Sequence, residues 1–212
     1  VMLALVAACS LHLHTWSDPA RHGKKMTEQT PGSSRAWAHY SGVYFKQYNT
    51  NKELGPLKRS VEILEQGMLA APSPSLAANL ITNKSILGTL GPHDWQKYLD
   101  LLQQAEPARV HTMSVQQLML NTENGYIKEP AQVLAAIEIL NSKPSMQPIE
   151  PLKVAVFAYT MGLKEEARTW FIHYARQEPA GSLQLGKTAS ELEAAGYLDW
   201  AQQMRAINQI NK

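Results

Sequence analysis

The stretch 149–179 has the pattern of two antiparallel helices, and this pair constrains the fold of the whole chain. Pro151 suits the first turn of a helix over 149–162, because a missing N–H costs nothing there. Gly162 can adopt the left-handed conformation that ends that helix, and Pro179 ends the second helix, over 163–179. Because two helices alone cannot bury their apolar faces, the pair predicts further helix pairs stacked against it.

Three small residues recur at a constant shift along the chain: Ala155, Gly162 and Ala167 return as Ala189, Gly196 and Ala201. The shift, about 34 residues, is the period of tetratricopeptide repeats, and small side chains let helices approach closely. We therefore predict an all-α fold of stacked antiparallel helix hairpins, a tetratricopeptide-like right-handed α-solenoid. A non-repetitive helical bundle is the alternative. The central region keeps no strict register of this kind, so regular repeats are expected in the C-terminal third.

Helix periodicity and breaker residues predict the remaining helices. The expected ranges are 19–29, 33–48, 56–71, 75–90, 93–106, 113–123, 131–141 and 198–210. Ser17 or Asp18 is the expected N-cap of the first of these. An aromatic stripe over 37–48 comprises Trp37, Tyr40, Tyr44 and Tyr48. It is interpreted as core, with a stacking surface for carbohydrate or peptide as the functional alternative.

The first residues have a different composition. Residues 1–16 are predicted to be a truncated transmembrane tail or the remnant of an export signal, since the apolar stretch is shorter than a bilayer span. The signal interpretation rests on the segment ending at Cys9, which resembles a bacterial lipobox. A buried N-terminal helix is a third option. Residues 17–30 are predicted to form an amphipathic linker helix, and 31–212 the repeat domain.

Charge and cysteine content exclude several classes of function. The formal net charge is +2, and the basic pairs are too dispersed for a nucleic-acid surface, so no nucleic-acid partner is predicted. A single cysteine excludes an intrachain disulfide and a cysteine-based zinc site. The basic residues of 21–25 suit either a solvated helix face or contact with anionic lipid headgroups.

A motif search finds no catalytic signature. The chain lacks the glycine-rich, P-loop, nucleophile-elbow and zinc-protease motifs. Residues of metal-ligating type near the start are His12, His14, Asp18 and His22. Only Asp18 and His22 would share a helix face, so no metal is predicted. Glu165 and Glu166 fit a helix N-terminus, where the macrodipole stabilises carboxylates. We expect neither a cofactor nor a catalytic residue, although a self-contained enzyme is not excluded.

A segment between residues 16 and 44 carries a family resemblance through a tryptophan-containing helix and a Pro-x-Ser-x-Arg-Ala segment. The matching residues are Trp16, Asp18, Pro31, Ser33, Arg35, Ala36, Gly42 and Tyr44. The segment resembles the junction in bacterial polytopic membrane proteins similar to the transmembrane-and-tetratricopeptide (C-fold) glycosyltransferases. The resemblance implies that helical repeats follow the last membrane helix and face the periplasm, and that the catalytic machinery lies upstream. No catalytic residue is carried over.

Two functions follow from these patterns. The first is a repeat scaffold at the outer face of a membrane glycosyltransferase-like protein, which binds a protein partner or a glycan acceptor and is attached to the membrane by its N-terminal segment. The second is an envelope lipoprotein of an assembly complex. Basic residues after the apolar stretch oppose a periplasmic location, which follows from the resemblance. If the repeats form a groove, the ligand-facing residues are predicted to be Leu152, Val156, Tyr159 and Thr160, with packing between repeats as the alternative.

Overall fold

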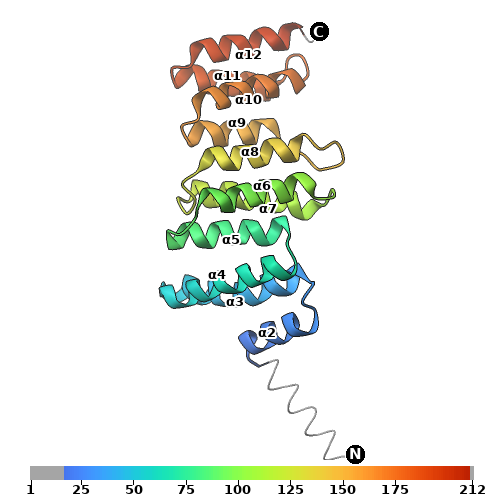
Figure 1. Ribbon diagram of the computed structural model, residues 1–212. Coiled ribbons are helices and arrows are strands. Elements are labelled where there is room, and N and C mark those ends of the chain that lie inside the picture. The colour runs from blue at the N-terminus through green and yellow to red at the C-terminus, as the bar shows by residue number, and fades with distance from the viewer. Residues whose placement is uncertain (1–16, 211–212) are drawn as a thin grey trace, which may run out of the picture. The chain divides into compact units, whose positions relative to one another are not determined.

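The computed structural model of this protein describes residues 17–210. Within this range the secondary structure consists of eleven α-helices and includes no strand, which confirms the predicted all-α class. Within each of the two units described below, helices close in sequence pack against one another, as α3 does with α4 and α9 with α10 (Figure 1). The chain divides after Lys128 into two compact units, which we call unit 1 and unit 2 and describe separately. The predictions for residues 1–16 lie outside the described residues.

Unit 1 contains six of the described helices, α2 to α7. Their bounds are Pro19–Gln29, Ser34–Asn51, Leu54–Ala70, Pro74–Leu87, Pro92–Gln104 and Arg109–Glu123. Helices α3 and α4 form one hairpin and α5 and α6 the next, and α5 also packs against α3 and α7. The three helices α3, α5 and α7 therefore follow one another along one face of unit 1.

Glycines allow very close helix contacts at the start of unit 1. A Cβ atom on Gly67 of α4 would lie 2.7 Å from Cβ of Trp37, and one on Gly23 of α2 would lie 2.9 Å from Cδ2 of Tyr40. Of the two predicted N-caps of α2, Ser17 and Asp18, the structure has Asp18. Its carboxylate accepts a hydrogen bond from the backbone N–H of Ala20 at 2.9 Å. The helix interpreted as a linker thus packs against α3 as part of unit 1.

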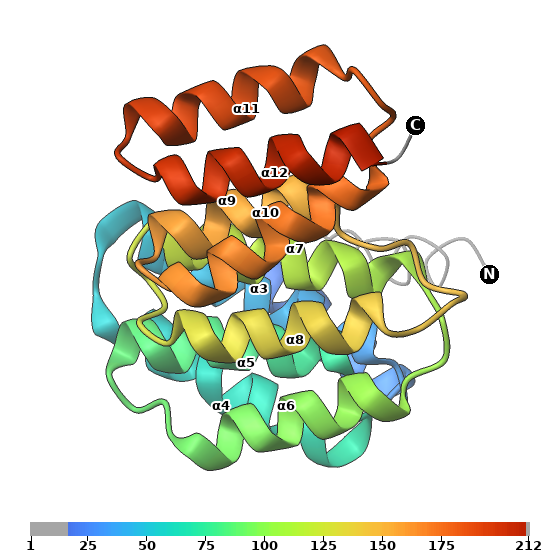
Figure 2. The same cartoon turned by 90° about the horizontal axis from the view of Figure 1, so that it is seen from above.

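Unit 2 contains helices α8 to α12. Their bounds are Pro130–Asn141, Pro151–Thr160, Lys164–Gln177, Leu183–Ala194 and Leu198–Ile210. Figure 2 shows α11 and α12 side by side, and these two helices pack against each other as α9 and α10 do. The four alanines of the predicted repeat, Ala155, Ala167, Ala189 and Ala201, are all buried in one apolar core.

The repeat in unit 2 extends to its backbone hydrogen bonds. Leu163 donates its N–H to the carbonyl of Ala158 at 2.9 Å, and at the equivalent place in the next hairpin Tyr197 donates to Leu192 at the same distance. The adjacent glycines, Gly162 and Gly196, both have a positive φ. The predicted repeat is therefore a repeat of local geometry as well as of residue type.

Related helix ends recur further toward the N-terminus than the sequence predicts. The residues with positive φ that follow α3, α5, α7, α9 and α11 are Lys52, Gly88, Gly125, Gly162 and Gly196. These residues are almost evenly spaced along the chain. Every second helix from α3 to α11 is therefore followed by a residue in the same left-handed conformation. The intervals between these residues up to Gly162 are slightly longer than the interval from Gly162 to Gly196. A search for the strict tetratricopeptide period therefore misses the repeats before Gly162.

No helix within residues 17–210 combines the length and the apolar character that a bilayer span requires.

Candidate functional site

A hollow of about 610 Å³ lies on the face of unit 1 along which α3, α5 and α7 follow one another. Its lining is rich in side-chain amides, contributed by Asn49, Asn79, Asn83, Gln117, Asn121 and Asn124. On α5 and α7 these amides occur in pairs four residues apart, Asn79 with Asn83 and Gln117 with Asn121, and residues at this spacing share one face of a helix. We call this cavity the amide hollow.

A chain of hydrogen bonds fixes the amides between α5 and α7. Asn121 donates through Nδ2 to Oγ1 of Thr82 at 2.9 Å, and Thr82 donates to the carbonyl of Ala78 at 3.2 Å. Gln117 donates through Nε2 to Oδ1 of Asn121 at 3.0 Å. These hydrogen bonds hold the amide of Asn121 in one orientation at the floor of the hollow, where the residue is only 8% exposed.

A second chain of hydrogen bonds crosses from α5 through α4 to α3. Asn83 donates through Nδ2 to Oγ of Ser60 at 2.8 Å, and Ser60 donates to the carbonyl of Ser41 at 3.0 Å. Asn83 is 4% exposed and lines the hollow, but its Oδ1 has no hydrogen-bond partner among the described residues. The oxygen of this nearly buried amide is therefore an acceptor for a ligand or for water.

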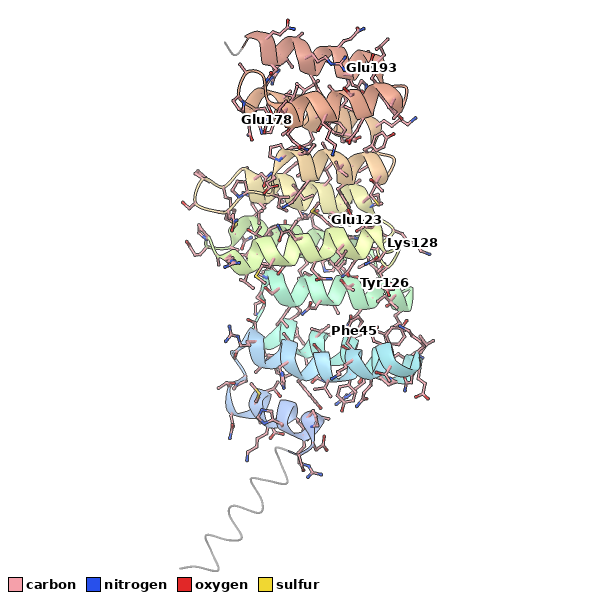
Figure 3. The ribbon with its side chains drawn as sticks, turned by 180° about the vertical axis from the view of Figure 1, so that it is seen from behind. Phe45, Glu123, Tyr126, Lys128, Glu178 and Glu193 are labelled. Atoms are coloured by element: carbon pink, nitrogen blue, oxygen red, sulfur yellow. The ribbon has the colours of Figure 1, made fainter. Side chains whose placement is uncertain are left out.

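The rim of the hollow adds an exposed amide and two aromatic rings. Asn79 lies one helical turn before Asn83, and its side chain makes no hydrogen bond to the described residues. Phe45 of α3 and Tyr126, which follows α7, also line the hollow and lie toward the same side of unit 1 in Figure 3. The hollow thus offers free donors and acceptors beside flat apolar surfaces.

One charged side chain lines the amide hollow, that of Lys52. Its backbone has φ 60°, and it is the only described residue other than glycine with a positive φ. The Nζ atom lies 5.3 Å from the centroid of the Tyr48 ring, within the range of a cation–π interaction.

An ion-pair cluster supports α5 away from the hollow. Nζ of Lys84 lies 2.9 Å from Oδ1 of Asp94 and 2.9 Å from Oε1 of Glu65, so that it joins α4, α5 and α6. Partial burial acts to lower the pKa of Lys84, but the hydrogen bonds to Asp94 and Glu65 outweigh this effect and the pKa is raised. The cluster therefore stabilises the helix that carries Asn79 and Asn83.

The residues predicted as ligand-facing lie in unit 2, where Leu152, Val156 and Tyr159 line a separate hollow of about 310 Å³. Gln184, Thr188 and Glu191 of α11 also line it. Thr160 is not part of this lining, and its hydroxyl donates to the carbonyl of Val156 at 2.9 Å. We call this cavity the apolar hollow; that it contacts a ligand stays a prediction.

The chain was compared with protein-family models, curated proteins and solved structures, and none of the three comparisons found a match. Residues 17–210 also contain no group of three or more histidine, cysteine or acidic side chains placed to hold a metal ion. The function is therefore inferred from the two hollows themselves.

The amide hollow is absent from the sites predicted from the sequence. The sequence nevertheless shows amide residues spaced four apart on both α5 and α7, Asn79 with Asn83 and Gln117 with Asn121. Polar residues repeated four apart on successive first helices are a detectable sign of this hollow, because helices of a repeat place equivalent residues on one surface.

Proposed function

We propose that this chain is a non-catalytic repeat scaffold that binds an extended segment of a partner protein in the amide hollow of unit 1. The observation that carries the proposal is the pair of hydrogen-bond chains that hold Asn83 and Asn121 nearly buried at the floor of the hollow. Fixed amides of this kind lose little entropy when a ligand binds, and such preorganisation favours affinity.

The chemistry of the side-chain amide matches that of a peptide backbone. Each carboxamide offers a donor and an acceptor, and each peptide unit offers the same pair in complementary order. Packed helices lie about 8–10 Å apart and an extended chain advances about 3.3 Å per residue, so amides on successive helices meet about every third residue. A peptide without proline at the contacting positions can satisfy this register, and side-chain preferences then come from the rim.

A glycan acceptor is the other ligand considered. The aromatic rings of Phe45 and Tyr126 could stack on a sugar as well as on a peptide side chain. The side-chain amides along α5 and α7 favour a peptide, because every peptide unit offers an amide donor and a carbonyl acceptor that pair with a carboxamide.

The test uses the purified chain in two parallel screens, one with displayed random peptides and one with a glycan array. We expect enriched peptides, whose dissociation constants are then measured by calorimetry. Asn79→Ala should weaken binding about 3- to 10-fold, the worth of one or two hydrogen bonds, without loss of stability. Gln116→Ala is the matched control, because Gln116 is exposed on α7 but does not line the hollow.

Two results would contradict the proposal. Enrichment of glycans without peptides would assign the hollow to the other ligand class. Selected peptides that bind equally well to the Asn79→Ala and Gln116→Ala variants would place the binding surface elsewhere.

For the wider setting, we propose that the scaffold serves at the periplasmic face of a membrane glycosyltransferase-like protein, with an envelope lipoprotein as the alternative. Support comes from the resemblance of the segment between Trp16 and Tyr44 to the junction in such proteins. A cysteine at the exposed position Lys46, probed with a membrane-impermeant thiol reagent in cells with a permeabilised outer membrane, should be labelled above a control without it. Protection would contradict the periplasmic location. The coding sequence upstream of Val1 separates the two settings: membrane helices there would indicate the first setting, and a short basic signal the second.

A further inference from the structure

We propose that Lys52 makes the amide hollow selective for peptides that place a carboxylate beside it. This inference rests on the proposed function and adds a ligand class to it. It depends on three observations about Lys52: its backbone conformation, its position in the hollow and its charge partners.

The backbone conformation is the first observation. Lys52 occupies the left-handed position after α3, and the corresponding positions after α5, α7, α9 and α11 are glycines. Glycine adopts this conformation without steric cost, whereas a lysine there brings its Cβ close to the backbone. The backbone conformation at this position is therefore less favourable with lysine than with glycine. Residues held in unfavourable backbone conformations concentrate at functional sites.

The position in the hollow is the second observation. Lys52 lines the same hollow as Asn49, Asn79 and Asn83, and it is the one charged residue of that lining. The ring of Tyr48 lies 5.3 Å from the Nζ atom, within the range of a cation–π interaction. An aromatic ring attracts an ammonium group but does not neutralise its charge.

The charge partners are the third observation. Within the described residues, Lys52 takes part in no ion pair, as is also true of the control residue Lys46. What distinguishes Lys52 is that its unpaired charge lies in the lining of the hollow. A lysine beside fixed amides can therefore accept a new anionic partner without breaking an existing pair. On a peptide this partner is a carboxylate, from an aspartate or glutamate side chain or from a free C-terminus.

A structural role is the competing explanation, because a cation near a helix C-terminus interacts favourably with the macrodipole. The two explanations differ in what Lys52→Gly does. If the role is structural, the thermal midpoint falls. If Lys52 serves ligand binding, glycine relieves the backbone conformation, so the thermal midpoint does not fall while binding weakens.

The experiment uses peptides selected on the wild-type chain. Lys52→Gln and Lys52→Gly should each weaken binding about tenfold and reduce its salt dependence, whereas Lys52→Arg should keep most of the affinity. Lys46→Gln is the matched control, because Lys46 is exposed on the same helix outside the amide hollow and should change affinity less than twofold. Two peptide series then separate the carboxylate sources: acidic side chains changed to amides, and the C-terminus amidated.

The outcomes distinguish this inference from the proposed function. If Asn79→Ala weakens binding but Lys52→Gln and Lys46→Gln behave alike, the peptide site stands and the role of Lys52 is overturned. Peptides that keep their affinity after both neutralisations overturn it as well. If neither Asn79→Ala nor Lys52→Gln affects binding, or if no peptide is selected, the proposed function fails and the inference with it.

Discussion

The two units use the same hairpin architecture but line their hollows with different chemistry. In unit 1 the floor consists of amides that bond to one another and to neighbouring helices, as Asn121 does with Thr82. In unit 2 the corresponding helix α9 presents Leu152, Val156 and Tyr159, and Val156 is 48% exposed. The floor of the amide hollow is thus built from groups held in place before any ligand arrives, whereas the apolar hollow presents mainly apolar side chains beside Gln184, Thr188 and Glu191.

Under the proposed function, the two hollows would differ in the feature of a ligand that each one recognises. Fixed amides match the backbone of a ligand and tolerate many side chains, whereas an apolar hollow selects by the size of a side chain. The helices themselves are positioned by small residues in both units, glycines in unit 1 and alanines in unit 2. If the two units differ in energy as they do in chemistry, matched substitutions in them should change stability by different amounts.

The largest effect is expected for Gly67→Ala. The added Cβ would lie 2.7 Å from Cβ of Trp37 and cannot be accommodated without moving α3 away from α4. We expect the free energy of unfolding to fall by about 2 kcal/mol, although alanine is the better helix former. Gly186→Ala in α11 is the control, since a Cβ there meets no atom within 4 Å. Chemical denaturation should show that Gly186→Ala is not destabilised. If both variants lose the same free energy of unfolding, the close contact at Gly67 is not what destabilises Gly67→Ala.

A smaller loss is expected for Asn83→Ala, which removes the donor to Ser60 inside unit 1. The free energy of unfolding should fall by about 1–1.5 kcal/mol, the usual net worth of a buried hydrogen bond. Val156→Ala in the apolar hollow should change it by about 0.5 kcal/mol or less, because Val156 is half exposed. If Val156→Ala costs as much as Asn83→Ala, the amide hollow is not the more preorganised of the two.

The smallest effect concerns the ion pairs. Lys84→Met should cost about 1 kcal/mol, since the Lys84 side chain is 16% exposed and contacts two carboxylates. Lys187→Met in unit 2 should cost less than about 0.5 kcal/mol, because Lys187 and Glu191 are 70% and 66% exposed. Thermal unfolding of both variants beside the wild type measures the difference.

The pH dependence of the Lys84 contribution has a defined sign. The folded-state pKa of Lys84 is raised above its ordinary value of 10.5, so its stabilising effect is complete below that value and is lost as pH rises through the folded-state pKa. The gap in stability between the wild type and Lys84→Met should therefore stay constant from neutral pH to about pH 9 and close only in more alkaline solution. A gap that closes below about pH 9 would contradict this assignment.

Much of the fold follows from local sequence, because helix ends are set by neighbouring residues. Helix α2 begins and ends where Asp18, Pro19 and Pro31 predict, and α12 has the predicted range Leu198–Ile210. Helix α7 begins at Arg109, whereas the sequence pattern predicts a later start, at Met113. No strong cap marks that start, since the residue before it, an alanine, has no side chain that can bond to the helix.

The candidate site is less accessible to sequence reasoning. Leu152, Val156 and Tyr159 line one hollow together because they share one face of a single helix, whereas Thr160 turns its hydroxyl to its own backbone. The amide hollow is lined by residues of three helices. The orientation of its amides depends on hydrogen bonds between helices, which no local sequence pattern reveals. The lysine at position 52 differs from an ordinary surface charge only through its φ and its neighbours.

The proposed function requires that the amides of unit 1 contact the ligand. The most direct measurement is an NMR titration of the ¹⁵N-labelled chain with a selected peptide, followed through the side-chain amide signals. We predict that the signals of Asn79, Asn83 and Gln117 shift with a common dissociation constant while that of Gln184, in the apolar hollow, stays unchanged. Shifts confined to Gln184, or absent from all three amides of unit 1 while the peptide binds, would contradict the claim.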